Sequence, residues 1–307
     1  MKTFSSVLSL LWCCLTLSNH VIKAEEEQRI IVTFRNELPE SVILYWEGND
    51  ERVAQNNGEP IASLGGELVA NTYIGHLFSY DYGGERHPVH IFPGSDSLRV
   101  LTAGRTEIAV KCTVTSHGNT VKNEPLTIRV VPWWSPRGAC RFLELIRLGY
   151  YNHNALTRVV PNFLTQFGIS ADYEMRTHWR NANISDDPVH NPKIPFLPGS
   201  LSFAGSGPDS RSTEIFIVMP ETAQSQLDYF GINPWETPFG FIDDVSTTPV
   251  ANWYSYGDMP PWGEGVDPQK VYKADGYEYL KRDFPRLDYI ETCEVEEIVL
   301  DEIASEL

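Results

Sequence analysis

The chain has 307 residues, of which 42% are hydrophobic and 21% charged, a composition typical of a globular protein. It is therefore not wholly disordered, collagen-like or a coiled coil, and its length suits about two domains. The 41 acidic residues exceed the 24 basic ones, and the net charge of −17 would repel a phosphate backbone. Nucleic acid is therefore not expected as a partner.

Residues 1–24 predict a secretory signal peptide. Lys2 precedes an apolar run at residues 4–17, and Ala24 is a small residue followed by three glutamates. The run is short for a membrane span, which favours a cleaved signal over an anchor. Removing these residues, which carry two lysines and no acid, makes the net charge −19. We expect a chain of the endoplasmic reticulum lumen or a secreted one, without a later membrane span.

Three cysteines remain beyond that segment, Cys112, Cys140 and Cys293. One disulfide with a third thiol, or three thiols, are both compatible with an odd number. The cysteine spacings and the scattered histidines do not resemble a ligand set, so neither a metal nor a cofactor is expected. Asn183 begins an N-x-S triplet and is a candidate glycosylation site in a secretory chain.

The first part of the chain predicts a small β-sandwich over residues 25–116. Short stretches alternate apolar and polar residues, and pairs such as Gly65-Gly66 and Gly83-Gly84 separate them. The expected strands are residues 30–34, 42–46, 68–74, 77–82, 89–92, 98–101 and 108–114. Residues 117–124 are polar and lack periodicity, which predicts a linker.

The second part, residues 125–300, predicts strands mixed with helices, followed by an acidic tail at residues 301–307. The clearest helix has Ser135 as a candidate cap and Pro136 in its first turn, and Gly149 ends it. Further helices are expected near residues 250–256 and 277–284, and strands at residues 126–131, 156–167, 199–204, 214–218 and 289–298. This pattern suggests a β-barrel with helical covers.

Three blocks of the second part resemble, in order, the signature of the cyclophilin-type peptidyl-prolyl isomerases. The blocks are residues 156–168 (LTRVVPNFLTQFG), residues 199–217 (beginning GSLSFAGSGP and ending STEIFI) and residues 227–242 (beginning LD and ending PFGFI). The resemblance covers about residues 126–298 and is closest to a branch with W-R and D-D-P between the first two blocks, here at residues 179–180 and 186–188. It implies a closed β-barrel with covering helices and an enzyme that isomerises X-Pro bonds.

The chemistry of this reaction defines the residues that such a site needs. The barrier is about 20 kcal/mol because the amide loses resonance as it twists. No bond breaks, so an apolar slot for the proline ring and a guanidinium that hydrogen-bonds the proline nitrogen in the transition state suffice. The resemblance assigns the guanidinium to Arg158 and a substrate-carbonyl contact to Gln166. It assigns substrate binding to Phe163, Leu164, Phe203, Ala204, Phe216 and Leu227.

Several positions depart from the family pattern. They are Thr157 for His, Leu164 for Met, Glu214 for Gln and Gln226 for an aromatic residue, and a pocket histidine beyond the third block's start is missing. A carboxylate at Glu214 would be able to pair with Arg158 and draw it away from substrate. The alternative function is therefore a catalytically weak cyclophilin-like scaffold that binds proline peptides.

The first part carries a second resemblance, to the β domain of the von Hippel–Lindau tumour suppressor family. It covers about residues 29–92 and rests on residues 34–36 (FRN), a strand that ends in Trp and residues 71–78 (NTYIGHLF). That family reads hydroxyproline in an aromatic slot. The resemblance implies a peptide-reading site made of Trp46, Thr72, His76 and Phe78. A module kept for its fold alone is the other interpretation. The expected partners are proline-containing or hydroxyproline-containing polypeptides.

Overall fold

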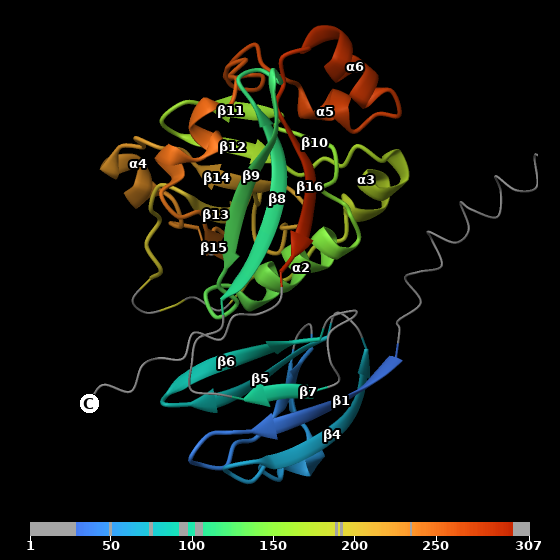
Figure 1. The fold of residues 1–307 in the computed structure, drawn as a ribbon, viewed down its shortest axis with the longest axis vertical. Coiled ribbons are helices and arrows are strands. Elements are labelled where there is room, and N and C mark those ends of the chain that lie inside the picture. Colours follow the sequence, from blue (N-terminus) through green and yellow to red (C-terminus); the bar gives the residue numbers. More distant parts are fainter. Residues whose placement is uncertain are drawn as a thin grey trace, which may run out of the picture.

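The computed structural model describes residues 29–48, 51–73, 76–91, 98–101, 107–187, 190, 193–233 and 235–296. The predicted signal peptide and acidic tail lie outside these residues. Figure 1 shows a smaller part made of short sheets below a larger part built on one strongly curved sheet. Among the described helices, none has the length and apolar character of a membrane span. No group of three or more His, Cys, Asp or Glu side chains in the described ranges is arranged to hold a metal ion.

Two small sheets organise the described residues up to Leu101. One has the order β4-β1-β7 and the other β3-β2-β5-β6. Their strands are β1 (Arg29–Asn36), β2 (Tyr45–Glu47), β3 (Arg52–Ala54), β4 (Gly66–Tyr73), β5 (Leu77–Tyr82), β6 (Glu85–His90) and β7 (Leu98–Leu101), and η2 (Asn56–Gly58) is a short 3-10 turn. Alternation buries one face of each sheet, and Phe34 of β1 meets Phe78 of β5 with ring centroids 5.0 Å apart.

The larger part is organised by a nine-stranded sheet of order β10-β16-β8-β9-β15-β13-β14-β12-β11. Its strands are β8 (Ile108–Ser116), β9 (Val121–Val130), β10 (Asn154–Ala155), β11 (Arg158–Val160), β12 (Leu164–Phe167), β13 (Ser200–Phe203), β14 (Ile215–Val218), β15 (Gly240–Phe241) and β16 (Tyr289–Val295). The two edge strands, β10 and β11, follow each other in the chain, so the sheet curls until its edges approach. No ladder joins these two edges in the described residues, so the barrel is open and the expectation of a closed barrel is wrong.

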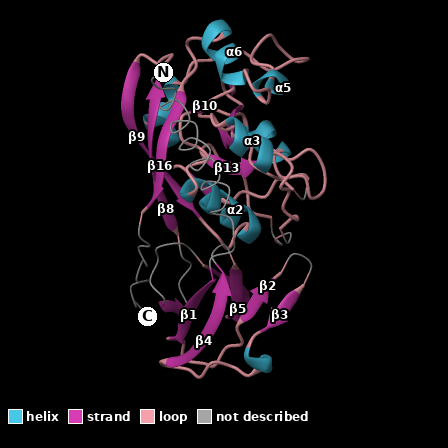
Figure 2. Cartoon of the chain, turned by 90° about the vertical axis from the view of Figure 1, so that its right-hand side faces the viewer, coloured by secondary structure: helices cyan, strands magenta, loops and turns pink. Residues whose placement is uncertain are grey.

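The helices lie around this sheet (Figure 2). They are α2 (Pro136–Arg147), α3 (Tyr173–Trp179), α4 (Gln224–Tyr229), α5 (Pro268–Val271) and α6 (Gly276–Asp283), with 3-10 turns η3 (Val245–Thr247) and η4 (Pro249–Asn252). The helices predicted after residue 135 and near residues 277–284 are confirmed as α2 and α6. The helix predicted near residues 250–256 is only the short turn η4. Gly149 follows α2 with φ of 68°, a left-handed conformation that costs glycine little.

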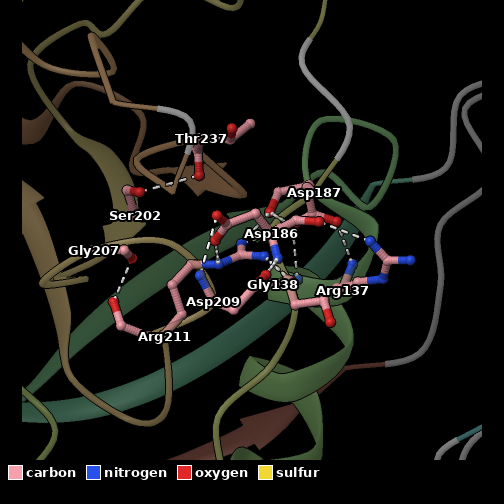
Figure 3. Close-up of polar contacts among 12 residues, drawn as sticks. Arg137, Gly138, Asp186, Asp187, Ser202, Gly207, Asp209, Arg211 and Thr237 are labelled. Carbon is pink, nitrogen blue, oxygen red and sulfur yellow. Dashed lines mark hydrogen bonds and ion pairs between the residues drawn. The ribbon is translucent and has the colours of Figure 1, made fainter. Parts of the chain in front are cut away.

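The N-terminus of α2 is capped from a distant segment. Ser135 occupies the cap position, as predicted, but its side chain makes no capping bond and donates to Asp187 instead. The Asp187 carboxylate accepts the Arg137 amide at 2.7 Å and the Gly138 amide at 3.1 Å (Figure 3). It also pairs with Arg211 at 2.7 Å, and both side chains are fully buried. A carboxylate at a helix N-terminus satisfies unpaired amides and favours the helix dipole.

The predicted linker at residues 117–124 is wrong. β8 and β9 form a hairpin in which Ser116 pairs with Val121, and only the turn between them is outside the strands. Within the turn, the Gly118 and Asn119 amides donate to the Asp288 carboxylate instead of to a neighbouring strand, with Asn119 N at 2.6 Å. Since β8 lies inside the nine-stranded sheet, residues 108–116 belong to the larger part, and β7 is the last described strand of the smaller part.

A disulfide joins two neighbouring strands of the large sheet. Cys112 of β8 and Cys293 of β16 are paired residues in the ladder, with Cα atoms 4.1 Å apart. Of the two possibilities that the sequence left open, the structure has one disulfide and a third cysteine, Cys140, outside it. The cross-link ties strands that are 181 residues apart in the chain.

Candidate functional site

Two neighbouring strands divide their side chains between the faces of the large sheet. Phe167 of β12 and Ile215 and Ile217 of β14 enter the main core with Phe142 of α2. The alternate residues form a second cluster on the opposite face, which we call the aromatic cluster. It comprises Leu164, Phe196, Phe216, Val218, Leu227 and Phe230, with Phe163 and Ala204 at its partly buried margin. Five of the six residues predicted to bind substrate therefore lie together.

Arg158 and Gln166 lie opposite each other in the β11–β12 ladder. Arg158 Nη1 donates to Gln166 Oε1 at 3.3 Å, and the guanidinium carbon lies 5.6 Å from the centroid of the Phe163 ring. The antiparallel hairpin creates this arrangement because its short turn returns β12 beside β11. The structure thus brings the predicted guanidinium, the predicted amide and an edge of the aromatic cluster into one place.

Asp258 is the main partner of Arg158 and was not among the residues predicted from the sequence. Arg158 Nε donates to Asp258 Oδ1 at 2.7 Å, and Nη2 donates to Oδ2 at 3.1 Å. Burial alone raises the pKa of this carboxyl, but hydrogen bonds from Arg158 and from the Met259 amide, with the Arg158 charge, outweigh it and leave the pKa below its ordinary value. The two residues are 100 positions apart, so no local pattern could have indicated the pair.

Glu214 does not pair with Arg158, contrary to the prediction. Its Oε2 accepts Gln166 Nε2 at 2.7 Å, and its Oε1 accepts the Tyr272 hydroxyl at 2.9 Å. Burial raises the pKa of Glu214, and the hydrogen bonds from Tyr272 and Gln166 only partly offset this effect. Because Glu214 takes the amide nitrogen of Gln166, the amide oxygen faces Arg158.

The predicted proline slot is filled by two aromatic residues, Phe230 and Phe196, that were not among the predicted site residues. Phe230 stacks on Phe163 with ring centroids 5.5 Å apart and on Phe216 at 5.2 Å, and Phe196 stacks on Phe216 at 5.9 Å. A proline ring between two parallel rings needs centroids about 7 Å apart, because each carbon contact takes about 3.5 Å. Only 4% of Phe216 is exposed. In this conformation the slot is closed.

Phe203 is a correction to the predicted substrate-binding set. Its side chain is fully buried in the main core, where it meets Phe239 with ring centroids 5.3 Å apart. Ala204 lies one position further along the chain and belongs to the aromatic cluster. Successive side chains of an extended segment point to opposite faces, so these two neighbours cannot both line one slot.

The structure brings together three of the four residues of the predicted site in the first part. Thr72 Oγ1 and His76 Nδ1 lie 3.0 Å apart, and the Trp46 ring is 5.4 Å from the His76 ring. Tyr73, which was not predicted, adds a ring 5.3 Å from His76. Phe78 is the exception: it is 2% exposed and packs into the core of the small sheets, beneath Trp46, its partner in the β2–β5 ladder.

Residues 115–247 match the family model described as cyclophilin type peptidyl-prolyl cis-trans isomerase/CLD. The chain therefore contains a cyclophilin-type peptidyl-prolyl cis-trans isomerase domain, as the three sequence blocks predicted. A Brucella abortus protein named as a peptidyl-prolyl cis-trans isomerase is 28% identical over 162 residues, 50% of this chain and 78% of that protein. An Arabidopsis thaliana protein that is also named as a peptidyl-prolyl cis-trans isomerase is 29% identical over 104 residues, 34% of this chain and 62% of its own.

The chain is also similar to a longer protein and to a solved structure. A Streptococcus pyogenes protein whose name joins a phosphatase to a peptidyl-prolyl cis-trans isomerase is 26% identical over 190 residues, 59% of this chain but only 37% of its own length. The solved cyclophilin-type isomerase of Cryptosporidium parvum covers 62% of this chain and 98% of its own, with 16% identity and a TM-score of 0.41. None of these comparisons supports the von Hippel–Lindau resemblance of the first part.

Proposed function

We propose that this protein is a peptidyl-prolyl cis-trans isomerase that acts on X-Pro bonds of secretory-pathway proteins and assists their folding. One observation carries the proposal, the fixed guanidinium of Arg158 between Gln166 and Phe163. Each terminal nitrogen of Arg158 donates one hydrogen bond within the described residues, which leaves one further N–H on each. These are donors for a proline nitrogen, whose lone pair is localised only in the twisted transition state.

Gln166 has a matching second role in this proposal. Its Nε2 donates one N–H to Glu214, and the amide group has a second N–H on the same nitrogen. That second donor suits the carbonyl of the residue before proline. Holding the substrate on both sides of the rotating bond lowers the barrier without any covalent step, since isomerisation requires only that the amide lose its resonance.

Three features support a secretory compartment. The first 24 residues have the pattern of a signal peptide. The structure contains the Cys112–Cys293 disulfide, and disulfides in general form and persist in oxidising compartments. The sequon residue Asn183 is exposed and so accessible to glycosylation. Expression of the full chain in cultured cells tests this assignment. The chain should be secreted and should show a gel shift that glycosidase treatment removes and that the Asn183→Gln variant lacks. Retention of an unmodified chain in the cytosol would contradict it.

A second function, a proline-peptide binder or scaffold with little turnover, is favoured by the closed slot. Phe230 and Phe196 pack where a proline ring would insert. A protease-coupled isomerisation assay on X-Pro peptides separates the two functions. The isomerase predicts acceleration that Arg158→Lys removes, because lysine lacks the planar fork, while the exposed control Arg129→Lys keeps it. The uncatalysed rate together with measurable peptide binding selects the scaffold, and no binding contradicts both.

For the first part we propose that it delivers proline-rich or hydroxyproline-rich clients to Arg158. The grouping of Thr72, His76 and Trp46 supports this, since it combines two polar groups with an aromatic face. Two weak sites on one chain raise each other's effective ligand concentration. Calorimetry of the full chain with paired proline and 4-hydroxyproline peptides tests it. Preference for the hydroxyproline peptide that His76→Ala abolishes is expected, and equal or undetectable affinities contradict the idea.

A further inference from the structure

The loop that carries Asp258 is attached directly to the strand that carries Arg158. Gly257 forms an antiparallel bridge with Val159, and Ser255 Oγ donates to the Val159 carbonyl at 2.5 Å. The loop therefore follows the free edge of β11 and places the next residue, Asp258, beside Arg158. The position of the carboxylate is thus set by backbone pairing and not only by its ion pair.

Two glycines allow the loop to close tightly around Asp258. Gly265 N donates to the Asp258 carbonyl at 2.8 Å, which returns the chain to the start of the loop. A Cβ at Gly263 would lie 2.4 Å from that same carbonyl oxygen, and a Cβ at Gly265 would lie 2.7 Å from the Gly257 carbonyl oxygen. Both distances are far below van der Waals contact, so this close approach requires glycine at each position. The Met259 amide also donates to Asp258 Oδ1 at 2.7 Å.

The pairing leaves the substrate-facing donors of Arg158 in place. The Asp258 carboxylate accepts hydrogen bonds from Nε and from one N–H of Nη2, which together form one side edge of the guanidinium. Gln166 accepts one N–H of Nη1. The Arg158 and Asp258 side chains are 14% and 23% exposed, so the pair is partly desolvated and its two bonds are stronger than those of a surface pair. An arginine held at two points does not have to lose its rotamer freedom when substrate binds.

We propose that Asp258 is the positioning residue for Arg158, holding the guanidinium side-on so that its terminal N–H groups are presented to the proline nitrogen. This inference rests on the proposed isomerase function. A carboxylate that blocked Arg158 would occupy both terminal nitrogens end-on, whereas the bonds here run to Nε and Nη2. Asp258 touches no reacting atom in this scheme and acts only through Arg158.

The experiment compares Asp258→Asn and Asp258→Glu in the full chain with wild type, using NMR exchange on an X-Pro peptide. Asp258→Asn loses the charge and one acceptor oxygen, so kcat falls about tenfold or more while KM changes little, because ground-state contacts to the ring persist. Asp258→Glu keeps the carboxylate and recovers part of the rate. Asp243→Asn, which alters an exposed Asp–Arg pair with Arg129, keeps the full rate. The Arg158 Nε–H NMR signal shifts in Asp258→Asn and not in the control.

Two other results have distinct meanings. An active wild type with an unchanged Asp258→Asn rate overturns the positioning role alone, and a faster Asp258→Asn variant overturns it by showing that the carboxylate competes with substrate. A wild-type chain that never exceeds the uncatalysed rate removes the proposed isomerase function, and the positioning role falls with it.

Discussion

Glu214 Oε2 lies 2.7 Å from Gln166 Nε2, and this bond determines which end of the Gln166 amide faces Arg158. The Glu214 carboxylate, which the sequence predicted to compete with substrate for Arg158, therefore helps to orient the residues around Arg158. Tyr272 holds the other oxygen of Glu214, so a continuous polar chain runs from Tyr272 through Gln166 to Arg158 and ends at Asp258. Linked hydrogen bonds of this kind polarise one another and restrain each member.

Glu214→Gln should stabilise the fold at neutral pH without accelerating isomerisation. The folded state raises the pKa of Glu214, so it binds more protons than the unfolded chain, and wild-type stability falls as pH rises from about 4.3 through the folded pKa. The glutamine side chain of the variant does not ionise, so the variant avoids the loss of stability that ionisation of Glu214 causes. Urea unfolding at a series of pH values should show a stability difference that grows with pH and vanishes near pH 4. The isomerisation rate of the variant should not rise. An amide at position 214 can donate as well as accept, so it no longer holds the Gln166 amide with its oxygen toward Arg158.

A stability difference that is equally large at pH 4 would show that ionisation of Glu214 is not the cause. Tyr272→Phe serves as the companion variant, since it removes one hydrogen bond to Glu214 and leaves the charge in place. It should lose about 1 kcal/mol of stability.

Phe230→Ala should open the proline slot. The ring is 8% exposed and stacks on Phe163 and Phe216, so its removal costs about 3 kcal/mol of stability. Substrate no longer has to displace a packed ring, and affinity for an Ala-Pro peptide should rise about fivefold or more, about 1 kcal/mol. Calorimetry measures the affinity. Phe203→Ala removes the same ring from the main core, so it should lose stability without gaining affinity; equal gains in both variants would contradict the closed slot.

Asp187→Asn should be strongly destabilising. The change leaves the buried Arg211 cation without its principal partner and weakens the cap of α2, which together cost about 3–5 kcal/mol. Chemical denaturation provides the measurement. Asp186→Asn is the matched control, because its carboxylate lies 3.6 Å from Arg211 and is 18% exposed, and about 1 kcal/mol is expected there. Equal losses in the two variants would argue against Asp187 as the main counter-ion.

A domain boundary before β8, as in the structure, and one at residues 117–124, as predicted from the sequence, make opposite predictions for truncated chains. A chain of residues 107–296 keeps β8, which pairs with both β9 and β16 and carries the Cys112–Cys293 disulfide. It should unfold cooperatively. A chain of residues 125–296 loses a central strand and should remain unfolded or aggregate, as judged by NMR dispersion and thermal melting. Cooperative unfolding of the shorter chain would restore the boundary at residues 117–124.

Patterns of residues close together in the sequence were enough to predict several helices and strands, the family and two site residues. The amphipathic pattern of α2 and the alternation of β1 predicted elements that the structure contains, and the three motif blocks predicted the family that residues 115–247 match. Arg158 and Gln166 lie side by side because one short hairpin joins their strands. The sequence did not show that β8 belongs to the large sheet, because the polar turn after β8 resembles a linker and its other partner strand lies 181 residues away. Only the tertiary structure placed Asp258 on Arg158 and Phe230 in the proline slot. Such contacts depend on how distant loops close over a sheet, and that is decided by packing and not by periodicity.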